Sequence, residues 1–373
     1  MRPGLKKELS LLCGFAAAYY FARKQPTKAT LMTLASGSLL LSSLKPSGYS
    51  YFGKSVLITG GSRGLGLALA KKLVAEGAWV TIVARKPDEL HDAKLLLLEI
   101  DPRAQVQTMV CDVTEPDQLT VAISQAVARF GRLDVLINNA GAISVGPFAS
   151  TERQDYEAQL KLHLFAVIEA TRIVRPLFRD QRGGKIINIC SMGGRVSVPH
   201  MLPYGVSKFA LSGFSQGIAA ELKREKIDVT TVYPALMQTG SPIQAVFKGD
   251  QQKEFSWFMS ADNFPLLSMP ADVAAEKILN GARNGETEVT LSVIGKARSV
   301  VAAFFPELMA VMMSLLARML PRGTSKTYKT GAQSRASFDQ NWALYPLRMT
   351  GAKAAQELNQ KPSQDAKFNL GLR

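Results

Sequence analysis

Cysteine is scarce in this chain of 373 residues, which contains only Cys13, Cys111 and Cys190. No CxxC pair and no cluster of cysteine with histidine occurs, so the sequence predicts neither a disulfide framework nor a metal site. Cys111 and Cys190 lie within apolar runs, where a free thiol acts as a small buried hydrophobic group. Free buried thiols are typical of proteins in a reducing compartment.

Charged residues are also sparse, at 20% of the chain, whereas 47% of the residues are hydrophobic. This balance excludes a disordered chain and suffices for a large core. Acidic residues are too few to offset 45 Lys and Arg, which leaves a net charge of +15. No nucleic-acid-binding motif accompanies the basic residues, so we expect no nucleic-acid partner. A protein that lies against anionic lipid or binds a phosphorylated small molecule explains the charge better.

The N-terminus lacks an apolar run of the roughly 20 residues that a membrane-spanning helix needs. Two shorter apolar stretches, Leu11–Ala22 and Leu31–Leu44, have Lys or Arg before, between and after them. Three interpretations remain open: a secretory signal peptide, a short or interfacial membrane anchor, and a helix packed on the protein surface. The basic flanks favour an anchor on the cytoplasmic side of a membrane.

The C-terminal part is divided between an apolar and a polar segment. Val300–Leu320 is apolar but contains Pro306, Glu307 and Arg318, which favours an amphipathic or substrate-channel helix over a simple span. Residues 321–373 are polar and weakly periodic, which predicts a partly ordered tail. We therefore divide the chain into an N-terminal extension (1–50), a central domain (51–295) and a helical C-terminal extension with a polar tail (296–373).

Apolar runs of strand length alternate with helical patterns between Lys54 and about Leu291. The predicted strands are Ser55–Thr59, Trp79–Ala84, Val106–Cys111, Val135–Ile137, Lys185–Cys190 and Val229–Tyr233. The predicted helices are Leu65–Glu76, Asp88–Ile100, Gln118–Phe130, Gln154–Arg179 and Val206–Lys223. Strands that are apolar throughout and separated by helices indicate a parallel sheet covered on both faces. The expected fold is α/β, a doubly wound parallel sheet of the Rossmann type with helical N- and C-terminal extensions.

The first turn of this module has the pattern TGxxxGxG, formed by Thr59, Gly60, Gly64 and Gly66. It follows a strand and opens a helix. Glycine lets the backbone approach a pyrophosphate, whose charge the helix N-terminus favours. A glycine-rich turn alone is weak evidence, because many such turns only bend the chain tightly.

Three further motifs follow in order: Asn138–Gly141 (NNAG), Ser191 after a strand, and Tyr204 with Lys208 (YxxxK). With these motifs the stretch from Lys54 to about Leu291 resembles the short-chain dehydrogenase/reductase family. The overall layout is similar to the membrane-associated branch that includes the 3-ketosphinganine reductases, although no motif fixes that substrate.

The resemblance implies a Ser191, Tyr204 and Lys208 active site. Hydride transfer between a nicotinamide and a carbonyl leaves negative charge on oxygen, which a proton must neutralise. Tyr204 would be the acid/base, Ser191 would bind the substrate oxygen, and Lys208 would bind the nicotinamide ribose. On a helix, Lys208 shares a face with Tyr204, and we expect its ammonium group to lower the pKa of the phenol. Taken alone, the two residues could be an ordinary surface pair.

His163 marks a departure from the family pattern, because it stands where the family usually has an asparagine that assists a proton path to the lysine. Histidine can donate, accept and carry a proton. It is therefore either a fourth catalytic residue or a buried residue without a role in the reaction. A second departure is Pro234-Ala235 in place of Pro-Gly.

The cofactor is predicted to be NADPH/NADP. No carboxylate stands at the end of the second strand, where Ala84-Arg85-Lys86 is found, and Arg63 lies inside the glycine turn. Two guanidinium groups suit a 2′-phosphate, whereas two solvated surface arginines are the alternative. The resemblance also implies an adenine contact from Asp112. Further cofactor contacts are expected from Ser62, Leu65, Val113, Asn139, Ala140, Gly141, Pro234 and Thr239, beside the turn, Tyr204 and Lys208.

The segment Gln238–Met269 lies where the family keeps a substrate lid. Its apolar residues either face a hydrophobic substrate or pack the lid on the body; they are Phe247, Phe255, Trp257, Phe258, Met259 and Phe264. With the apolar ends, they favour NADPH-dependent reduction of a lipophilic ketone to a secondary alcohol. An NADP-dependent alcohol dehydrogenase and a non-catalytic NADP(H)-binding scaffold remain alternatives. The fold also suggests a homodimer or homotetramer through the helices Gln154–Arg179 and Val206–Lys223.

Overall fold

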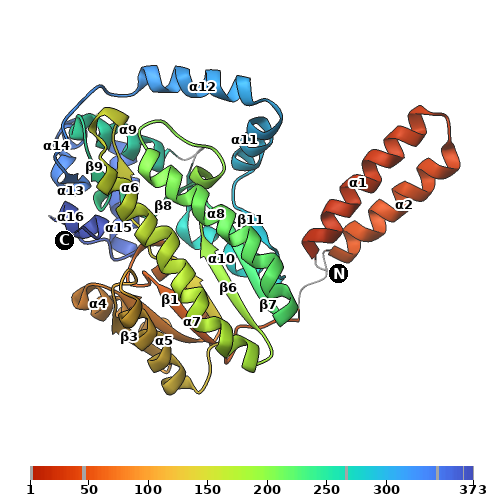
Figure 1. Cartoon of the computed structure of the whole chain (residues 1–373), viewed down its shortest axis with the longest axis horizontal. Coiled ribbons are helices and arrows are strands. Elements are labelled where there is room, and N and C mark those ends of the chain that lie inside the picture. The colour runs from red at the N-terminus through yellow and green to blue at the C-terminus, as the bar shows by residue number, and fades with distance from the viewer. Residues whose placement is uncertain (1–2, 44–47, 265–267, 342–343, 364, 373) are drawn as a thin grey trace.

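A computed structural model describes residues 3–43, 48–264, 268–341, 344–363 and 365–372. Residues 1–2 and 44–47 of the expected N-terminal extension, 265–267 of the expected lid, and 342–343, 364 and 373 of the expected tail lie outside the described residues. The centre is a seven-stranded parallel sheet in the order β11-β7-β6-β4-β1-β2-β3 (Figure 1). Its strands are β1 (Ser55–Thr59), β2 (Trp79–Ala84), β3 (Val106–Val110), β4 (Val135–Asn138), β6 (Gly184–Ile189), β7 (Ile227–Tyr233) and β11 (Glu288–Thr290).

Helices cover both faces of the sheet, as expected for a doubly wound fold. One core lies between the sheet and α3 (Gly64–Ala75), α4 (Pro87–Leu98) and α10 (Ala271–Arg283). The opposite core lies between the sheet and α5 (Pro116–Phe130) and α7 (Ala166–Asp180). Successive β1 residues alternate between the two cores: Val56 and Ile58 face the first and Leu57 the second. This alternation explains why the strands are apolar throughout, and it confirms the predicted fold class.

The long helix predicted over Gln154–Arg179 is interrupted. It consists of α6 (Arg153–Leu160), a π-helix over Lys161–Phe165, and α7. α8 (Leu202–Leu222) begins four residues before the prediction, with Pro203 in its first turn. Proline suits that position because the first amides of a helix have no intrahelical acceptor.

Short strands beside the main sheet position the chain that follows it. β8 (Leu236–Gln238) pairs with β10 (Ser268–Pro270). β9 (Val246–Phe247) lies between β5 (Ser144–Val145) and β12 (Lys329–Thr330). Ala235 does not have a positive φ, so alanine in place of glycine after Pro234 causes no backbone strain.

The aromatic segment over α9 (Gln251–Asn263) packs mainly on the body. Phe247, Phe255, Phe258 and Met259 form a buried cluster with Phe338 from α14 (Ala336–Gln340). Of the apolar residues expected to face a substrate, only Phe258 also lines the main cavity. Most of the apolar residues of the expected lid therefore pack this segment on the body and do not face the cavity.

The described residues after Pro321, where we predicted a partly ordered polar tail, include four helices. They form α13 (Gly331–Ser334), α14, α15 (Tyr345–Glu357) and α16 (Ala366–Leu370), and they bury Phe338, Leu358, Ala366 and Leu370. These buried apolar residues are few and widely spaced, so they form no helical period from which the sequence could predict the helices.

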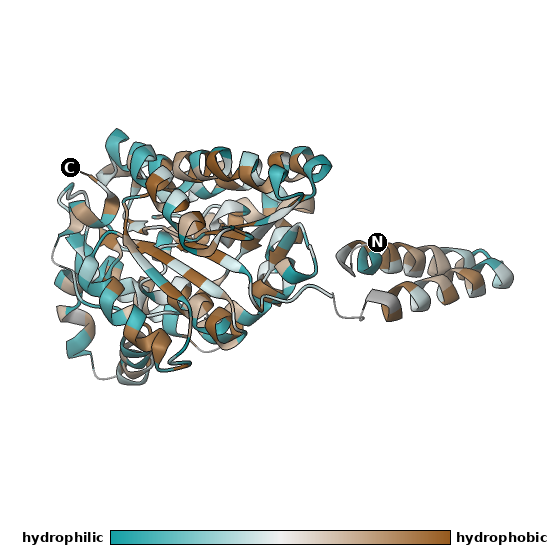
Figure 2. Cartoon of the chain, turned by 90° about the horizontal axis from the view of Figure 1, so that it is seen from below, coloured by the Kyte–Doolittle hydropathy of each residue, from teal (hydrophilic) through white to brown (hydrophobic). Residues whose placement is uncertain are grey.

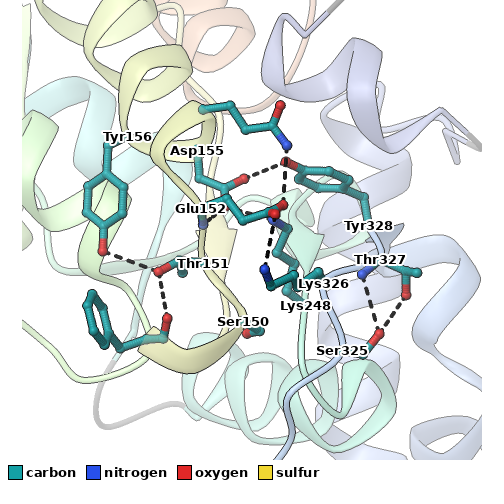
Figure 3. Close-up of polar contacts among 12 residues, drawn as sticks. Ser150, Thr151, Glu152, Asp155, Tyr156, Lys248, Ser325, Lys326, Thr327 and Tyr328 are labelled. Atoms are coloured by element: carbon teal, nitrogen blue, oxygen red, sulfur yellow. Dashed lines mark hydrogen bonds and ion pairs between the residues drawn. The ribbon is translucent and has the colours of Figure 1, made fainter.

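An ionic network with a buried centre also attaches this C-terminal part to the domain (Figure 3). Lys248 Nζ lies 2.8 Å from Asp155 Oδ2 and 3.3 Å from Glu152 Oε2. Tyr328 donates its hydroxyl hydrogen to Asp155 Oδ1 at 2.8 Å, and Lys326 lies near Glu152. Lys248 and Asp155 are almost completely buried, so each needs the other as a partner.

Two apolar elements lie outside the sheet layers. The N-terminal residues form a helical hairpin, α1 (Pro3–Ala22) and α2 (Pro26–Ser43), which stands apart from the body and carries apolar residues along both helices (Figure 2). α11 (Val293–Phe304) and α12 (Pro306–Met319) follow the sheet. In the described part of the chain, no single helix has the length and apolar character to cross a membrane. The pair α11 and α12 meets those criteria only jointly, with a bend of 119°.

Candidate functional site

One continuous cavity of about 510 Å³ extends from the glycine turn to α11, along the carboxyl ends of the parallel strands. It brings together Ser191, Tyr204, Lys208 and His163 with most of the residues expected to bind a cofactor. Of the latter, the lining includes Gly60, Ser62, Arg63, Gly64, Leu65, Arg85, Asp112, Val113, Asn139, Ala140, Gly141, Pro234 and Thr239. Thr59 and Gly66 do not line the cavity and lie behind the residues that do. The position is the usual ligand site of an open α/β sheet.

The glycine turn fits the pyrophosphate of a dinucleotide. Gly60 and Gly64 have φ values of +64° and +55°, which side chains rarely adopt. A Cβ on Gly66 would lie 2.2 Å from the Gly60 carbonyl oxygen, so only glycine permits this close approach. The turn leads into the N-terminus of α3, whose backbone dipoles favour an anion.

Asn139 and Thr59 hold the turn in place. Asn139 Nδ2 donates to the carbonyl oxygens of Thr59 and Gly60, at 3.0 Å in both cases. Thr59 Oγ1 accepts hydrogen bonds from the backbone amides of Asn139 and Ala140. Asn139 therefore links the NNAG segment to the turn, a positioning role that the sequence pattern does not reveal.

The basic residues at the adenosine end have protein partners. Arg63 Nη1 lies 2.9 Å from Glu89 Oε1, and Lys86 Nζ lies 3.2 Å from the same oxygen. Glu89 comes from the first turn of α4, so the carboxylate that the end of β2 lacks reaches this region from the next helix. Three cations, Arg63, Arg85 and Lys86, therefore lie at this end of the cavity together with Glu89, and Arg85 also lies near the Asp112 and Asp365 carboxylates.

Asp112 and Arg85 complete the adenosine end. Asp112 Oδ1 accepts hydrogen bonds from the backbone amide and the hydroxyl group of Thr114, which fixes its carboxylate at the end of β3. Burial lowers the pKa of Arg85, whereas the nearby Asp112 carboxylate raises it. An anion bound beside this guanidinium group would replace part of the hydration that burial removes.

Ser191, Tyr204 and Lys208 meet at the middle of the cavity. Ser191 follows β6, and Tyr204 and Lys208 are one helical turn apart near the start of α8. The Ser191 hydroxyl group is hydrogen-bonded to the Tyr204 phenol. Lys208 Nζ donates to the Ile189 carbonyl oxygen at 2.9 Å and lies 5.7 Å from the centroid of the Tyr204 ring. The three side chains thus form one cluster on one wall.

The phenol is less acidic than the sequence led us to expect. Burial raises the pKa of Tyr204 to about 12 and outweighs the hydrogen bond from Ser191, which lowers it. Burial also lowers the pKa of Lys208 to about 8. The ammonium group does not offset the burial of the phenol, because it lies over the ring and donates to a backbone carbonyl. The Tyr204 phenol therefore keeps its proton at physiological pH.

His163 lies in the π-helix and is fully buried. Its Nε2 accepts the backbone amide hydrogen of Ala142 at 3.2 Å, so the proton resides on Nδ1, which lies 2.8 Å from Ser207 Oγ. Ser207 in turn donates to the Tyr204 carbonyl oxygen at 2.7 Å. Burial lowers the pKa of His163 well below its ordinary value, and the Lys208 charge lowers it further. This geometry favours a neutral positioning residue that connects the NNAG segment with the start of α8.

The end of the cavity beyond Tyr204 is mainly apolar. Its lining includes Ile143, Val198, Met201, Leu236, Met237 and Ile294. Two polar residues are set into it, Asp262 from α9 and Arg298 from α11. Burial raises the pKa of Asp262 to about 8, and its Oδ2 has no hydrogen-bond partner among the described residues. The sequence analysis identified neither residue.

The family model described as short chain dehydrogenase matches residues 54–246. A fatty acyl-CoA reductase from Acinetobacter baylyi is 30% identical over 277 residues, which cover 73% of this chain and 87% of the relative. A 3-ketodihydrosphingosine reductase from Bacteroides thetaiotaomicron is 35% identical over 185 residues, which cover 50% of this chain and 64% of the relative. The crystal structure of L-sorbose reductase from Gluconobacter frateurii, complexed with NADPH and L-sorbose, is similar with a TM-score of 0.58 and 26% identity. That match covers 65% of this chain and 95% of the solved one.

Proposed function

Because the chain belongs to the short-chain dehydrogenase family of oxidoreductases, which act on CH-OH and C=O groups, we propose that it reduces a lipophilic ketone to a secondary alcohol with NADPH. The observation that carries this proposal is the cluster of Ser191, Tyr204 and Lys208 inside the same cavity as the glycine turn. A cation and two hydroxyl groups arranged at a dinucleotide-sized cleft suit carbonyl reduction.

NADPH, when bound, supplies the hydride to the carbonyl carbon. Ser191 donates a hydrogen bond to the carbonyl oxygen, where negative charge develops. Tyr204 gives its phenolic proton to that oxygen and becomes a phenolate. Lys208 holds a positive charge near the phenolate and binds the nicotinamide ribose. His163 holds the start of α8, and with it Tyr204, in position through its hydrogen bond with Ser207.

The names of the two relatives, both reductases, support the reductive direction, and the protonation state of Tyr204 is compatible with it. A phenol that keeps its proton at neutral pH is ready to donate it, whereas oxidation of an alcohol needs the phenolate as a base. The three cations at the adenosine end support NADPH as the cofactor, since a 2′-phosphate adds charge that NADH lacks.

A lipophilic substrate is supported by the apolar end of the cavity. The names of the two relatives, a fatty acyl-CoA reductase and a 3-ketodihydrosphingosine reductase, point to lipid chemistry in those proteins. The buried Asp262 and the half-buried Arg298 would face polar atoms of the substrate that lie away from the carbonyl.

Association with the cytoplasmic side of a membrane is part of the proposal. The α1–α2 hairpin exposes large apolar residues along its length, among them Leu11, Phe15, Phe21 and Leu41. A second exposed apolar surface covers α11 and α12, whose Ile294 also lines the cavity. Apolar helices with basic flanks suit a lipid headgroup region. This arrangement would place the cavity near lipid.

The experiment is a series of methyl ketones of increasing chain length, with NADPH consumption as the readout. We expect kcat/KM to rise with each added methylene until the apolar part of the cavity is filled, by up to about 4-fold per methylene from transfer out of water. A membrane-pelleting assay of the full chain, with and without residues 1–47, tests the association. A kcat/KM that is independent of chain length, or best for short polar ketones, would contradict the lipophilic substrate.

A further inference from the structure

The C-terminal segment crosses the opening of the dinucleotide site. The strap, as we name residues 358–363 together with 365–372, contributes Gln360, Phe368, Asn369, Leu370 and Gly371 to the lining of the cavity. The opposite wall consists of the glycine turn and the ends of β2 and β3. The strap lies more than 100 residues beyond the region that the family model matches, so that match assigns it no role.

The first half of the strap is fixed to the glycine turn by hydrogen bonds. Gly64, the first residue of α3, donates its amide hydrogen to the Leu358 carbonyl oxygen at 2.9 Å. Asn359 donates to the carbonyl oxygens of Ser62 and Glu89, at 3.0 and 2.9 Å. Lys361 forms an ion pair with Asp92 of α4. These contacts hold the chain directly over the N-terminus of α3.

The second half of the strap covers Arg85 at the adenosine end. Arg85 Nη1 donates to the Phe368 carbonyl oxygen at 2.5 Å, and the guanidinium carbon lies 4.2 Å from the centroid of the Phe368 ring. Asn369 donates to the Gln244 carbonyl oxygen at 2.9 Å. The strap therefore bridges the cleft from the turn to the end of β2.

Gln360 is the residue of the strap that points to a ligand. The residue is buried, with a relative exposure of 8%, and its Oε1 has no hydrogen-bond partner among the described residues. Its Nε2 lies 3.0 Å from the position that a Cβ on Gly64 would occupy, so the carboxamide sits beside the start of α3. The carboxamide oxygens of Gln244 and Asn369, which also line the cavity, are likewise without partners in the described structure. Buried carboxamides normally find partners, so three such oxygens in one cavity indicate a polar ligand.

We propose that the strap is part of the cofactor site, that Gln360 binds the dinucleotide beside its pyrophosphate, and that the strap must open for the cofactor to exchange. The Gln360 carboxamide donates from Nε2 to a phosphate oxygen and accepts at Oε1 from a neighbouring ribose hydroxyl group. Gln244 and Asn369 offer further acceptors to ribose hydroxyl groups. This inference rests on the proposed function only in requiring a nicotinamide dinucleotide in the cavity.

The test measures binding of NADPH and NADH to the full chain by the fluorescence of the reduced nicotinamide, without substrate. Because hydrogen bonds to charged groups are stronger than neutral ones, we expect Gln360→Ala to weaken both dinucleotides about 10-fold. Gln360→Glu has nearly the same size but places a carboxylate beside the pyrophosphate, and should weaken both by about 30-fold or more. The matched controls are Gln356→Ala and Gln356→Glu, at an exposed position of α15 four residues before Gln360, and these should bind like the wild type. Thermal unfolding of the Gln360 variants and the wild type without cofactor separates a binding role from a structural one. If Gln360 had only a structural role, the variants would be less stable than the wild type in the absence of the dinucleotide.

Opening of the strap is measured by limited trypsin cleavage after Lys367, which is exposed and precedes Phe368. Saturating NADPH should slow this cleavage about 10-fold or more, because the dinucleotide binds only beneath the closed strap. If the wild type binds NADPH and the Gln360 variants bind it equally well, or if NADPH leaves the cleavage rate unchanged, the role of the strap is refuted while the proposed reaction stands. If the full chain binds neither dinucleotide, the strap proposal and the proposed function fail together.

Discussion

Tyr204→Phe should lower kcat for ketone reduction about 1,000-fold while the Kd of NADPH changes less than about 3-fold, because general acid catalysis contributes factors of this size. The substitution removes only the hydroxyl group, and the ring retains its edge-to-face contact with His163, 5.5 Å between centroids. Stopped-flow measurement of NADPH oxidation in a single turnover gives the rate of the chemical step.

The pH dependence gives a second check on Tyr204. Its pKa is raised to about 12, so the phenol keeps its proton between roughly pH 6 and 9, and the rate of the chemical step should not change between about pH 6 and 7. Burial lowers the pKa of Lys208 to about 8, so the rate should fall as the pH rises through that value and the charge beside the phenolate is lost. An exposed tyrosine such as Tyr345 provides the control, since Tyr345→Phe should leave kcat unchanged. Equal single-turnover rates for Tyr204→Phe and the wild type would mean that another group donates the proton, or that NADPH is consumed in a different reaction.

Arg85→Ala should raise the Kd of NADPH about 100-fold relative to that of NADH, since a lost guanidinium-phosphate contact removes charge-assisted hydrogen bonds. The comparison of the two dinucleotides is essential, because Arg85 also donates to the strap at Phe368. Loosening the strap would weaken NADPH and NADH alike, whereas loss of a 2′-phosphate contact affects NADPH alone. Isothermal titration calorimetry with each dinucleotide measures both constants.

The matched control for Arg85 is Arg103→Ala, which removes the same charge from a side chain that is 95% exposed and precedes β3. It should leave the ratio of the two constants unchanged. If Arg85→Ala weakens both dinucleotides equally, the arginine acts through the strap, and the NADPH preference must come from Arg63 and Lys86 or be absent.

The sequence predicted the parts of the site that depend on local pattern. The glycine turn requires positive φ at Gly60 and Gly64, so its residues can be identified without knowledge of the rest of the fold. The apolar strands and the order of the motifs likewise predicted the parallel sheet and the edge where Ser191, Tyr204 and Lys208 meet. The assignment of roles to these residues stays a prediction that the experiments above test.

The remaining features depend on contacts between distant segments. From the sequence, Glu89 is only an acidic residue in the first turn of a helix. It reaches Arg63 because α4 packs beside the glycine turn, and the sequence does not predict that packing. The strap has no apolar period, because its attachment consists of backbone hydrogen bonds and single side chains such as Asn359. The pKa of Tyr204 follows from its burial, which the YxxxK motif does not encode. Similarly, the π-helix that places His163 could not be read from residue types alone.

The most direct test of the proposed reaction is isotope transfer from NADPH dideuterated at C4 of the nicotinamide to a long-chain ketone. Mass spectrometry of the alcohol should show one deuterium per molecule, formed by the wild type and nearly absent with Tyr204→Phe. An alcohol without deuterium, or labelled alcohol formed equally by both proteins, would contradict hydride transfer at the Ser191, Tyr204 and Lys208 cluster.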